Sequence, residues 1–272
     1  MPFFTHDGIQ FHYQESGSGR PFVFQHGLGG DVTQPFGLFL PPAGVRLLAF
    51  DARGHGKTAP LGDPAQLCFR VFGEDLRAFL DHLGIQRAVV GGISMGAALA
   101  LHFTLRWPAR VGALVLSRPA WLEDPCPWNV NIFSLIAKLV RAHGPAEGLV
   151  RFRQTPDYAE ALREWPDVAR SLAQQFENPR CEETVEKLER IIIDRPHPDR
   201  AAWSRLKLPA LVMANRLDPI HPLAYGEELA REIPGAVFRE ITSKSVNVEQ
   251  HGTDVQKALE EFLGGLDSAA SC

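Results

Sequence analysis

The chain has 272 residues, of which 45% are hydrophobic and 22% charged, and its formal net charge is −4. This composition is typical of one large globular domain, or of a core with a smaller insert, and it offers no basic surface for nucleic acid or anionic membranes. The longest apolar runs are far shorter than the roughly 20 residues of a membrane-spanning helix. We therefore expect a small-molecule partner, and neither nucleic acid nor membrane.

The N-terminus and the cysteines bear on the cellular compartment. Residues 1–6 lack the basic region and the cleavage site of a secretion signal. The cysteines are widely spaced, without the C-x-x-C pattern of a metal or redox site: Cys68, Cys126, Cys181 and Cys272. We expect free thiols in the cytoplasm and no metal or other cofactor. The sequence does not define the oligomeric state and leaves a homodimer open.

Strand and helix patterns alternate through the first 120 residues. Asp7-Gly8 is a strong hairpin signal between two strand-like runs. A helix is predicted from Asp63, with one apolar face, and Gly84 ends it. Strands are predicted at 3–6, 9–15, 22–25, 46–50 and 111–116, and in the apolar run that leads to Gly92. This alternation predicts a mostly parallel sheet with helices on its faces.

The alternation stops at Ser117. From there to Leu208 we find no convincing strand, and apolar residues recur at helical spacing in the stretches 132–140 and 182–193. Strand and helix order then resumes, with strands at 210–213 and 236–241, a helix at about 222–232 and a final helix.

These patterns predict two structural parts. Residues 1–120 and 206–272 form an α/β core, and residues 121–205 form a helical insert. Such inserts most often lie over the carboxyl ends of the strands, where open α/β sheets bind ligands.

A serine stands at the apex of a strand-to-helix turn in Gly92-Ile93-Ser94-Met95-Gly96. On such a corner the hydroxyl is held clear of the sheet, and the flanking positions need residues with almost no side chain. The free N–H groups of the following helix can stabilise developing negative charge. We predict Ser94 as a nucleophile and the N–H of Met95 as one donor of an oxyanion hole.

With these features the whole chain resembles the α/β-hydrolase fold superfamily. The resemblance rests on His26-Gly27, Asp51-x-Arg53-Gly54-x-Gly56, Gly92-x-Ser94-x-Gly96, Asp218 after the penultimate strand and His251 before the last helix. Serine, aspartate and histidine follow one another in the order that this fold uses. The resemblance implies a mostly parallel eight-stranded sheet with helices on both faces. It also implies a helical cap, inserted after the sixth strand, at residues 121–205.

The resemblance also implies a catalytic triad. Ser94 attacks the substrate, His251 serves as its general base, and Asp218 holds the imidazole in the required tautomer. His251 is favoured because we expect it in the loop after the last strand. His221 is the rival base, since it follows Asp218 by three residues in the same loop.

Some members of this superfamily place the acid just past the sixth strand, so Glu123 and Asp124 are alternatives to Asp218. The resemblance places the second oxyanion donor at the residue after His26-Gly27, which is Leu28. His26 itself is interpreted as a structural residue that shapes this loop.

The segment Asp51–Thr58 permits another interpretation. Gly56-Lys57-Thr58 resembles the end of a phosphate-binding P-loop, but that motif requires glycine where Asp51 stands. We expect Asp51 and Arg53 to tie the edge of the sheet together instead.

The insert supplies aromatic residues that can line a substrate pocket. Trp121 and Trp128 are favoured because they follow the sixth strand as the chain leaves the core, and Phe133 is a third candidate. Such a lining favours a small apolar or aromatic acyl or alcohol group.

These residues predict a cofactor-free serine hydrolase that cleaves a small carboxylic ester through an acyl-enzyme. The same machinery serves enol-lactonases, carbon–carbon bond hydrolases, thioesterases and perhydrolases in this superfamily. Gly252 after the favoured base lowers the carbon–carbon option, since one such branch typically has tryptophan there. A ligand receptor on a hydrolase scaffold is the alternative of another class.

Overall fold

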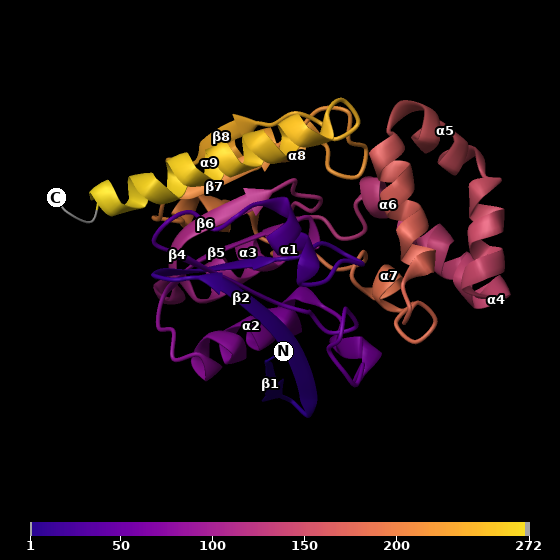
Figure 1. The fold of residues 1–272 in the computed structure, drawn as a ribbon, viewed down its shortest axis with the longest axis horizontal. Coiled ribbons are helices and arrows are strands. Elements are labelled where there is room, and N and C mark those ends of the chain that lie inside the picture. Colours follow the sequence, from indigo (N-terminus) through magenta and orange to yellow (C-terminus); the bar gives the residue numbers. More distant parts are fainter. Residues whose placement is uncertain (1, 270–272) are drawn as a thin grey trace.

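The computed structural model describes residues 2–269 and contains one eight-stranded sheet in the order β1-β2-β4-β3-β5-β6-β7-β8 (Figure 1). β2 pairs antiparallel with both β1 and β4, and the other neighbours are parallel. The mostly parallel eight-stranded sheet is therefore confirmed. The strands are β1 (Phe3–His6), β2 (Ile9–Gly17), β3 (Arg20–Gln25), β4 (Val45–Phe50), β5 (Ala88–Ile93), β6 (Val111–Ser117), β7 (Ala210–Ala214) and β8 (Val237–Glu240).

Asp7 and Gly8 form the tight turn of the predicted hairpin. Both have positive φ, 51° and 73°, which suits the turns that match the twist of paired strands. The register places His6 opposite Ile9, so the turn contains only these two residues.

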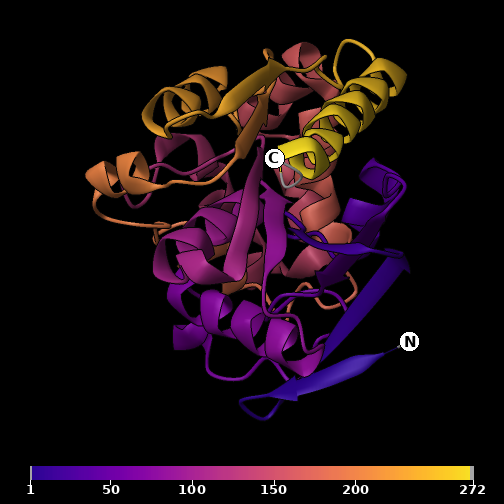
Figure 2. The same cartoon turned by 90° about the vertical axis from the view of Figure 1, so that its left-hand side faces the viewer.

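Helices cover both faces of the sheet (Figure 2). Because side chains alternate along a strand, neighbouring residues of β5 enter different layers. Val90 belongs to the hydrophobic cluster that includes α2 and α3, whereas Val89 belongs to the cluster that includes α9. The core helices are α1 (Thr33–Leu38), η1 (Pro64–Gln66), α2 (Phe69–His82), α3 (Met95–Arg106), η2 (Pro108–Arg110), α8 (Leu223–Glu232) and α9 (Val248–Ala269).

Between β6 and β7 the chain forms only helices and loops, and Figure 1 shows α4, α5 and α6 beside the sheet. Gly144 interrupts α4 with a φ of 72°, directly before Pro145, so this helix is kinked. The helices are η3 (Trp128–Val130), α4 (Ile132–Arg153), α5 (Pro156–Glu164), α6 (Pro166–Glu177), α7 (Lys187–Arg190) and η4 (Arg200–Arg205).

Two predicted helices differ in length from those observed. Asp63 does cap a helical turn, since its side chain accepts a hydrogen bond from the Ala65 N–H, but that turn is the separate η1. α2 begins only at Phe69. The stretch 182–193 contains only the four-residue α7, although the apolar residues Val185, Leu188, Ile191 and Ile192 are buried.

The last helix begins earlier than predicted, and this moves a residue of interest. Asn247 Oδ1 accepts a hydrogen bond from the Gln250 N–H at 2.9 Å, as an N-cap residue does. α9 therefore starts at Val248, and His251 lies in its first turn rather than in the preceding loop.

Two further findings concern the described residues alone. Within 2–269, no helix is long and apolar enough to cross a bilayer. Cys68, Cys126 and Cys181 are free thiols, and Cys272 lies outside the described residues.

Candidate active site

Ser94 occupies a strained turn between β5 and α3. Its φ of 57° and ψ of −115° lie where residues other than glycine are rarely found. The flanking glycines are required by space: a Cβ on Gly92 would lie 2.4 Å from the backbone of Gly96, and one on Gly96 would lie 2.2 Å from the Gln25 carbonyl oxygen. The sequence therefore forces this serine onto the corner that the G-x-S-x-G pattern predicts.

Ser94 lines a cavity of about 280 Å³ between the core and the helical insert. The core contributes Leu28 and Ile93 to the walls, and the insert contributes Phe133, Val168 and Leu172. This volume is at the lower end of the range for small-molecule sites. The site is therefore concave and partly apolar, with the serine in its wall.

Asp218 is buried and shared between two partners. Arg118 donates from Nε and Nη2 to the same carboxylate oxygen, at 2.9 and 2.5 Å. His221 Nδ1 lies 3.0 and 2.9 Å from the two carboxylate oxygens. Burial opposes ionisation of Asp218, but Arg118 and His221 outweigh it and hold the pKa of this carboxyl well below its usual value.

The structure does not bring His251 together with Asp218. The Nδ1 of His251 lies 2.7 Å from the Thr242 carbonyl oxygen and donates to it, which leaves Nε2 buried without a partner. In the described residues no hydrogen bond joins this imidazole to Asp218, and His251 is not among the residues that line the Ser94 cavity. The predicted Asp218–His251 pair is therefore corrected. α9 starts early enough to include His251, and the ring bonds the loop carbonyl of Thr242 in place of Asp218.

His221 is the histidine that meets both requirements of a base at this site. Its Nδ1 is anchored on Asp218, and its side chain lines the same cavity as Ser94. The ring's hydrogen bonds within the described chain all use Nδ1, and the side chain keeps 12% of its surface exposed. Burial lowers the pKa of His221 below its usual value, against the raising effect of Asp218. A neutral imidazole with a free Nε2 can accept a proton.

Two cationic residues of the site were missed by the sequence analysis. Arg118 follows β6 directly, with a φ of 46°, and lines the cavity beside Ser94. Lys244 stands in the loop between β8 and α9, where the base was expected, and also lines the cavity. Burial, and then the charge of Arg118, lowers the pKa of Lys244. The strands that precede both residues were predicted. Local sequence patterns do not show which residues from other segments lie next to Arg118 and Lys244.

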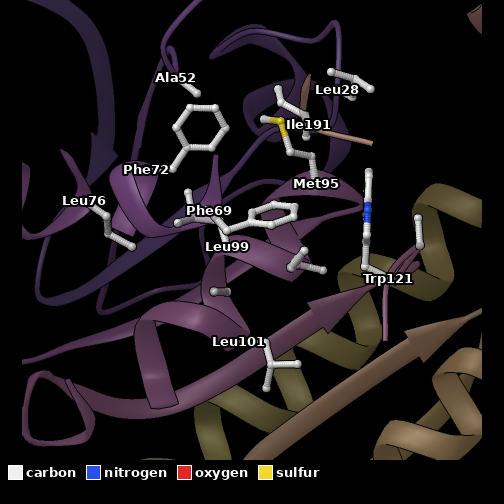
Figure 3. Packing of buried hydrophobic residues seen from close by; sticks show 14 of the residues in the cluster. Leu28, Ala52, Phe69, Phe72, Leu76, Met95, Leu99, Leu101, Trp121 and Ile191 are labelled. Atoms are coloured by element: carbon white, nitrogen blue, oxygen red, sulfur yellow. The ribbon is translucent and has the colours of Figure 1, made fainter. Parts of the chain in front are cut away.

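The predicted oxyanion donors lie beside the serine. Leu28 lines the cavity, and Met95 directly follows Ser94 at the start of α3. In the described chain, neither backbone N–H is engaged by a loop or side-chain acceptor. Figure 3 shows Leu28 and Met95 among the buried residues of one hydrophobic cluster, so both positions belong to the packed core.

His26 has the structural role that was predicted. Its Nδ1 lies 2.8 Å from the Gly27 carbonyl oxygen, and its Nε2 accepts a hydrogen bond from the Ala52 N–H at 3.0 Å. Both ring nitrogens are therefore occupied. Asp51 and Arg53 are likewise structural: Asp51 accepts from backbone N–H groups, and Arg53 pairs with buried Asp75.

The aromatic pocket candidates divide into two groups. Phe133 lines the cavity, whereas Trp121 and Trp128 do not. Trp121 is buried in the core, with its ring 5.6 Å from that of Phe69, and Trp128 is 66% exposed. These two tryptophans are therefore corrected as pocket residues. Position along the chain placed them near the site, but it does not define which way a side chain points.

The alternative acids lie away from the cavity. Glu123 pairs with Arg200 at 3.3 Å, and Asp124 is exposed. Neither lines the space above Ser94.

The fold and this site define an α/β hydrolase. A model of the alpha/beta hydrolase fold family matches residues 20–250, so the chain belongs to that family. Among solved structures, an enol-lactonase from Burkholderia xenovorans LB400 has a TM-score of 0.73 at 24% identity, and the match covers 97% of this chain and 100% of that one. An esterase from Thermogutta terrifontis has a TM-score of 0.73 at 23% identity, with 97% of both chains covered.

Curated relatives carry the names of hydrolases and of a haloperoxidase. A putative carbamate hydrolase RutD from Pseudomonas savastanoi is 30% identical over 80% of this chain and 83% of its own length. A 3-oxoadipate enol-lactonase from Acinetobacter baylyi is 24% identical, over 88% of this chain and 93% of the relative. A non-heme haloperoxidase from Rhodococcus erythropolis is 38% identical, but the match spans only 43% of either chain.

Proposed function

We propose that the protein is a serine hydrolase in which Ser94, His221 and Asp218 form the catalytic triad. One observation carries this proposal: His221, anchored through Nδ1 on Asp218, lines the same cavity as the strained Ser94. The family and the hydrolase names of the relatives support a hydrolytic activity. The assignment keeps the acid that was predicted and replaces His251 with the rival base.

In the proposed mechanism, Ser94 Oγ attacks the carbonyl carbon while His221 Nε2 takes the hydroxyl proton. The N–H groups of Leu28 and Met95 stabilise the negative charge of the tetrahedral intermediate. His221 then gives its proton to the leaving alcohol, and the acyl-enzyme forms. Water, deprotonated by the same imidazole, releases the acid and restores Ser94.

We propose a small carboxylic ester as the substrate. The cavity volume of about 280 Å³ supports a ligand of modest size. An enol-lactone is the second candidate, because a solved neighbour and a curated relative that cover most of the chain are enol-lactonases. Residues 121–205 would serve as a cap in either case, since Phe133, Val168 and Leu172 supply one wall of the cavity.

The test combines covalent labelling with pre-steady-state kinetics. A fluorophosphonate should label one peptide, which contains Ser94, and a 4-nitrophenyl ester of a short acid should give a burst of nitrophenol. Ser94→Ala should abolish both signals. His221→Ala should lower kcat by about a thousandfold or more. A burst that persists in Ser94→Ala would move the nucleophile elsewhere. Tight ligand binding without any burst from the wild type would favour the receptor alternative.

The two histidines must be separated in the same assay. His251→Ala should leave the burst in place, because this ring does not line the cavity. A large loss of turnover in His251→Ala, with normal rates in His221→Ala, would restore the original assignment. A pH–rate profile whose only inflection lies in the pH range where lysine titrates would instead indicate Lys244 as the base.

A further inference from the structure

The Ser94 cavity has more positive than negative charge in its walls. Arg118, Arg170 and Lys244 line it, and the only carboxylate among its described lining residues is Asp167. Arg170 and Asp167 come from α6, whereas Lys244 comes from the loop between β8 and α9. The cations therefore face the cavity from both the insert and the core.

Two of these charges have partners of their own. Arg118 donates two hydrogen bonds to Asp218, so its charge is largely balanced. Asp167 Oδ1 accepts a hydrogen bond from the Ser245 hydroxyl. The charge of Asp167 acts to raise the pKa of Lys244, against the larger lowering effects of burial and Arg118.

Lys244 and Arg170 have no such partner. Across residues 2–269, neither side chain has a hydrogen bond or an ion pair with another described residue. For Arg170 this is unusual, because every other arginine of the insert has a hydrogen bond, an ion pair or both. Those paired arginines are Arg141, Arg151, Arg153, Arg163, Arg180, Arg190, Arg195, Arg200 and Arg205.

Burial makes the unpaired charge of Lys244 more costly. The side chain is half-buried beside Arg118, so it loses water and also meets a like charge. A cation in such a place is stabilised when an anion supplies both charge and hydrogen-bond acceptors. Arg170 can add a bidentate contact, which suits the planar carboxylate group.

We propose that Lys244 and Arg170 form a subsite for a carboxylate of the substrate, a few atoms from the ester that Ser94 attacks. This inference rests on the proposed function for the ester, but the subsite itself is a binding property. The substrate class is then a monoester, or lactone, of a short dicarboxylic acid. The cavity of about 280 Å³ limits the acid to a short chain.

Binding is measured first, by calorimetry on the Ser94→Ala protein, so that no turnover is needed. The probes are monomethyl succinate, monomethyl glutarate and monomethyl adipate, each compared with the neutral isostere in which a carboxamide replaces the carboxylate. For at least one chain length, Kd for the carboxylate should be about tenfold lower or more. High salt should reduce this preference, because it screens the partly exposed charges.

Charge-removing variants identify the residues. In the Ser94→Ala background, Lys244→Met and Arg170→Gln should each reduce the carboxylate preference severalfold. Arg151→Gln is the matched control, because this exposed arginine of the insert pairs with Glu147 and does not line the cavity. The control should keep the full preference.

Hydrolysis of the corresponding 4-nitrophenyl esters by the wild type separates the two proposals. Preferential binding of the carboxylate without any hydrolysis would remove the serine hydrolase and leave the subsite. Equal binding of carboxylate and carboxamide at every chain length would overturn the subsite, whether or not the esters are cleaved. A preference that survives both Lys244→Met and Arg170→Gln would overturn it too.

Discussion

The negative charge of Asp218 is shared between two partners, Arg118 and His221. Arg118 donates two hydrogen bonds to one oxygen, and His221 contacts both oxygens. An acid that served the histidine alone would raise the pKa of the imidazole strongly. The guanidinium reduces this effect, so His221 stays neutral and able to accept a proton over a wider range of pH.

The variant Arg118→Met tests this competition. Removing the guanidinium should raise the pKa of His221, because its nearest positive neighbour is lost while Asp218 remains. The acidic limb of kcat/KM, which requires a neutral base, should therefore move to higher pH. The pH–rate profile of the wild type and the variant measures this shift. An unmoved limb would contradict the role of His221 as base.

The same variant should lower stability in a pH-dependent way. At pH about 8, Asp218 keeps its buried charge and loses its cationic partner, which costs about 3–5 kcal/mol in comparable pairs. At pH about 5.5, protonated His221 can replace that partner, so the loss should be smaller. Denaturant unfolding at the two pH values gives the difference. An equal loss at both would show that His221 does not compensate Asp218.

At the scale of elements, the start of α9 explains why His251 lies in a helix and not in the predicted loop. Asn247 is the N-cap, and the Asp254 carboxylate accepts from the Thr242 N–H at 2.8 Å, which fixes the preceding loop against the helix. Gly252 also lies inside the helix. A helix boundary predicted from sequence can be wrong by a few residues, and here that error placed a helical histidine in the preceding loop.

Other elements were predictable because one local rule dominates each of them. Asp7-Gly8 sets its turn by positive φ, and Gly92 and Gly96 are required by backbone contacts that no side chain fits. The cavity differs because it depends on which residues meet from distant segments. Arg170 and Lys244 approach one space from α6 and from the loop after β8, and no local pattern carries that information.

A short stretch before and within α7 fastens the insert to the core loop 51–58. Arg180 Nη1 donates to the carbonyl oxygens of Gly56 and Thr58 at 3.1 and 2.6 Å. Buried Lys187 donates to the Gly54 carbonyl oxygen at 2.9 Å. These charged donors bond three carbonyl oxygens of one core loop, so they hold this part of the insert in a fixed position against the core.

Arg180→Ala should therefore weaken this attachment by about 2 kcal/mol, since hydrogen bonds from charged donors are among the stronger ones. Denaturant unfolding measures the loss, and limited proteolysis within residues 178–199 should become faster. Arg190→Ala is the matched control. Among the described residues, the only ion pair of Arg190 is a 3.9 Å contact with Glu186, and Arg190 is exposed, so its loss should cost no more than about 0.5 kcal/mol. Equal effects of the two variants would contradict the attachment.

At the scale of the whole molecule, burial of neutral histidines makes the fold sensitive to acid. Burial lowers the pKa of five of them: His26, His55, His102, His221 and His251. They lie in the loops after β3 and β4, in α3, at the candidate site and in α9. Protonation therefore opposes folding at several places at once.

The pH dependence of stability is set by how many protons the folded and unfolded states bind. A histidine with a lowered pKa binds fewer protons in the folded state than in the unfolded state, so stability rises with pH up to the unfolded value near 6.5. For His251, burial lowers the pKa to about 4. The folded state therefore keeps its full stability above pH 6.5, and loses stability through this histidine as the pH falls from 6.5 towards 4. A shift of this size corresponds to about 3 kcal/mol.

Calorimetry should therefore find a Tm that falls steeply between pH about 6.5 and about 4. His251→Gln keeps a polar side chain and removes the titrating ring, so it should be less stable than the wild type at pH 7.5 but lose less on acidification. His143→Gln, which changes an exposed histidine of the insert, should follow the wild-type curve. If His251→Gln loses as much stability as the wild type between these pH values, the buried imidazole of α9 does not control the acid limit of the fold.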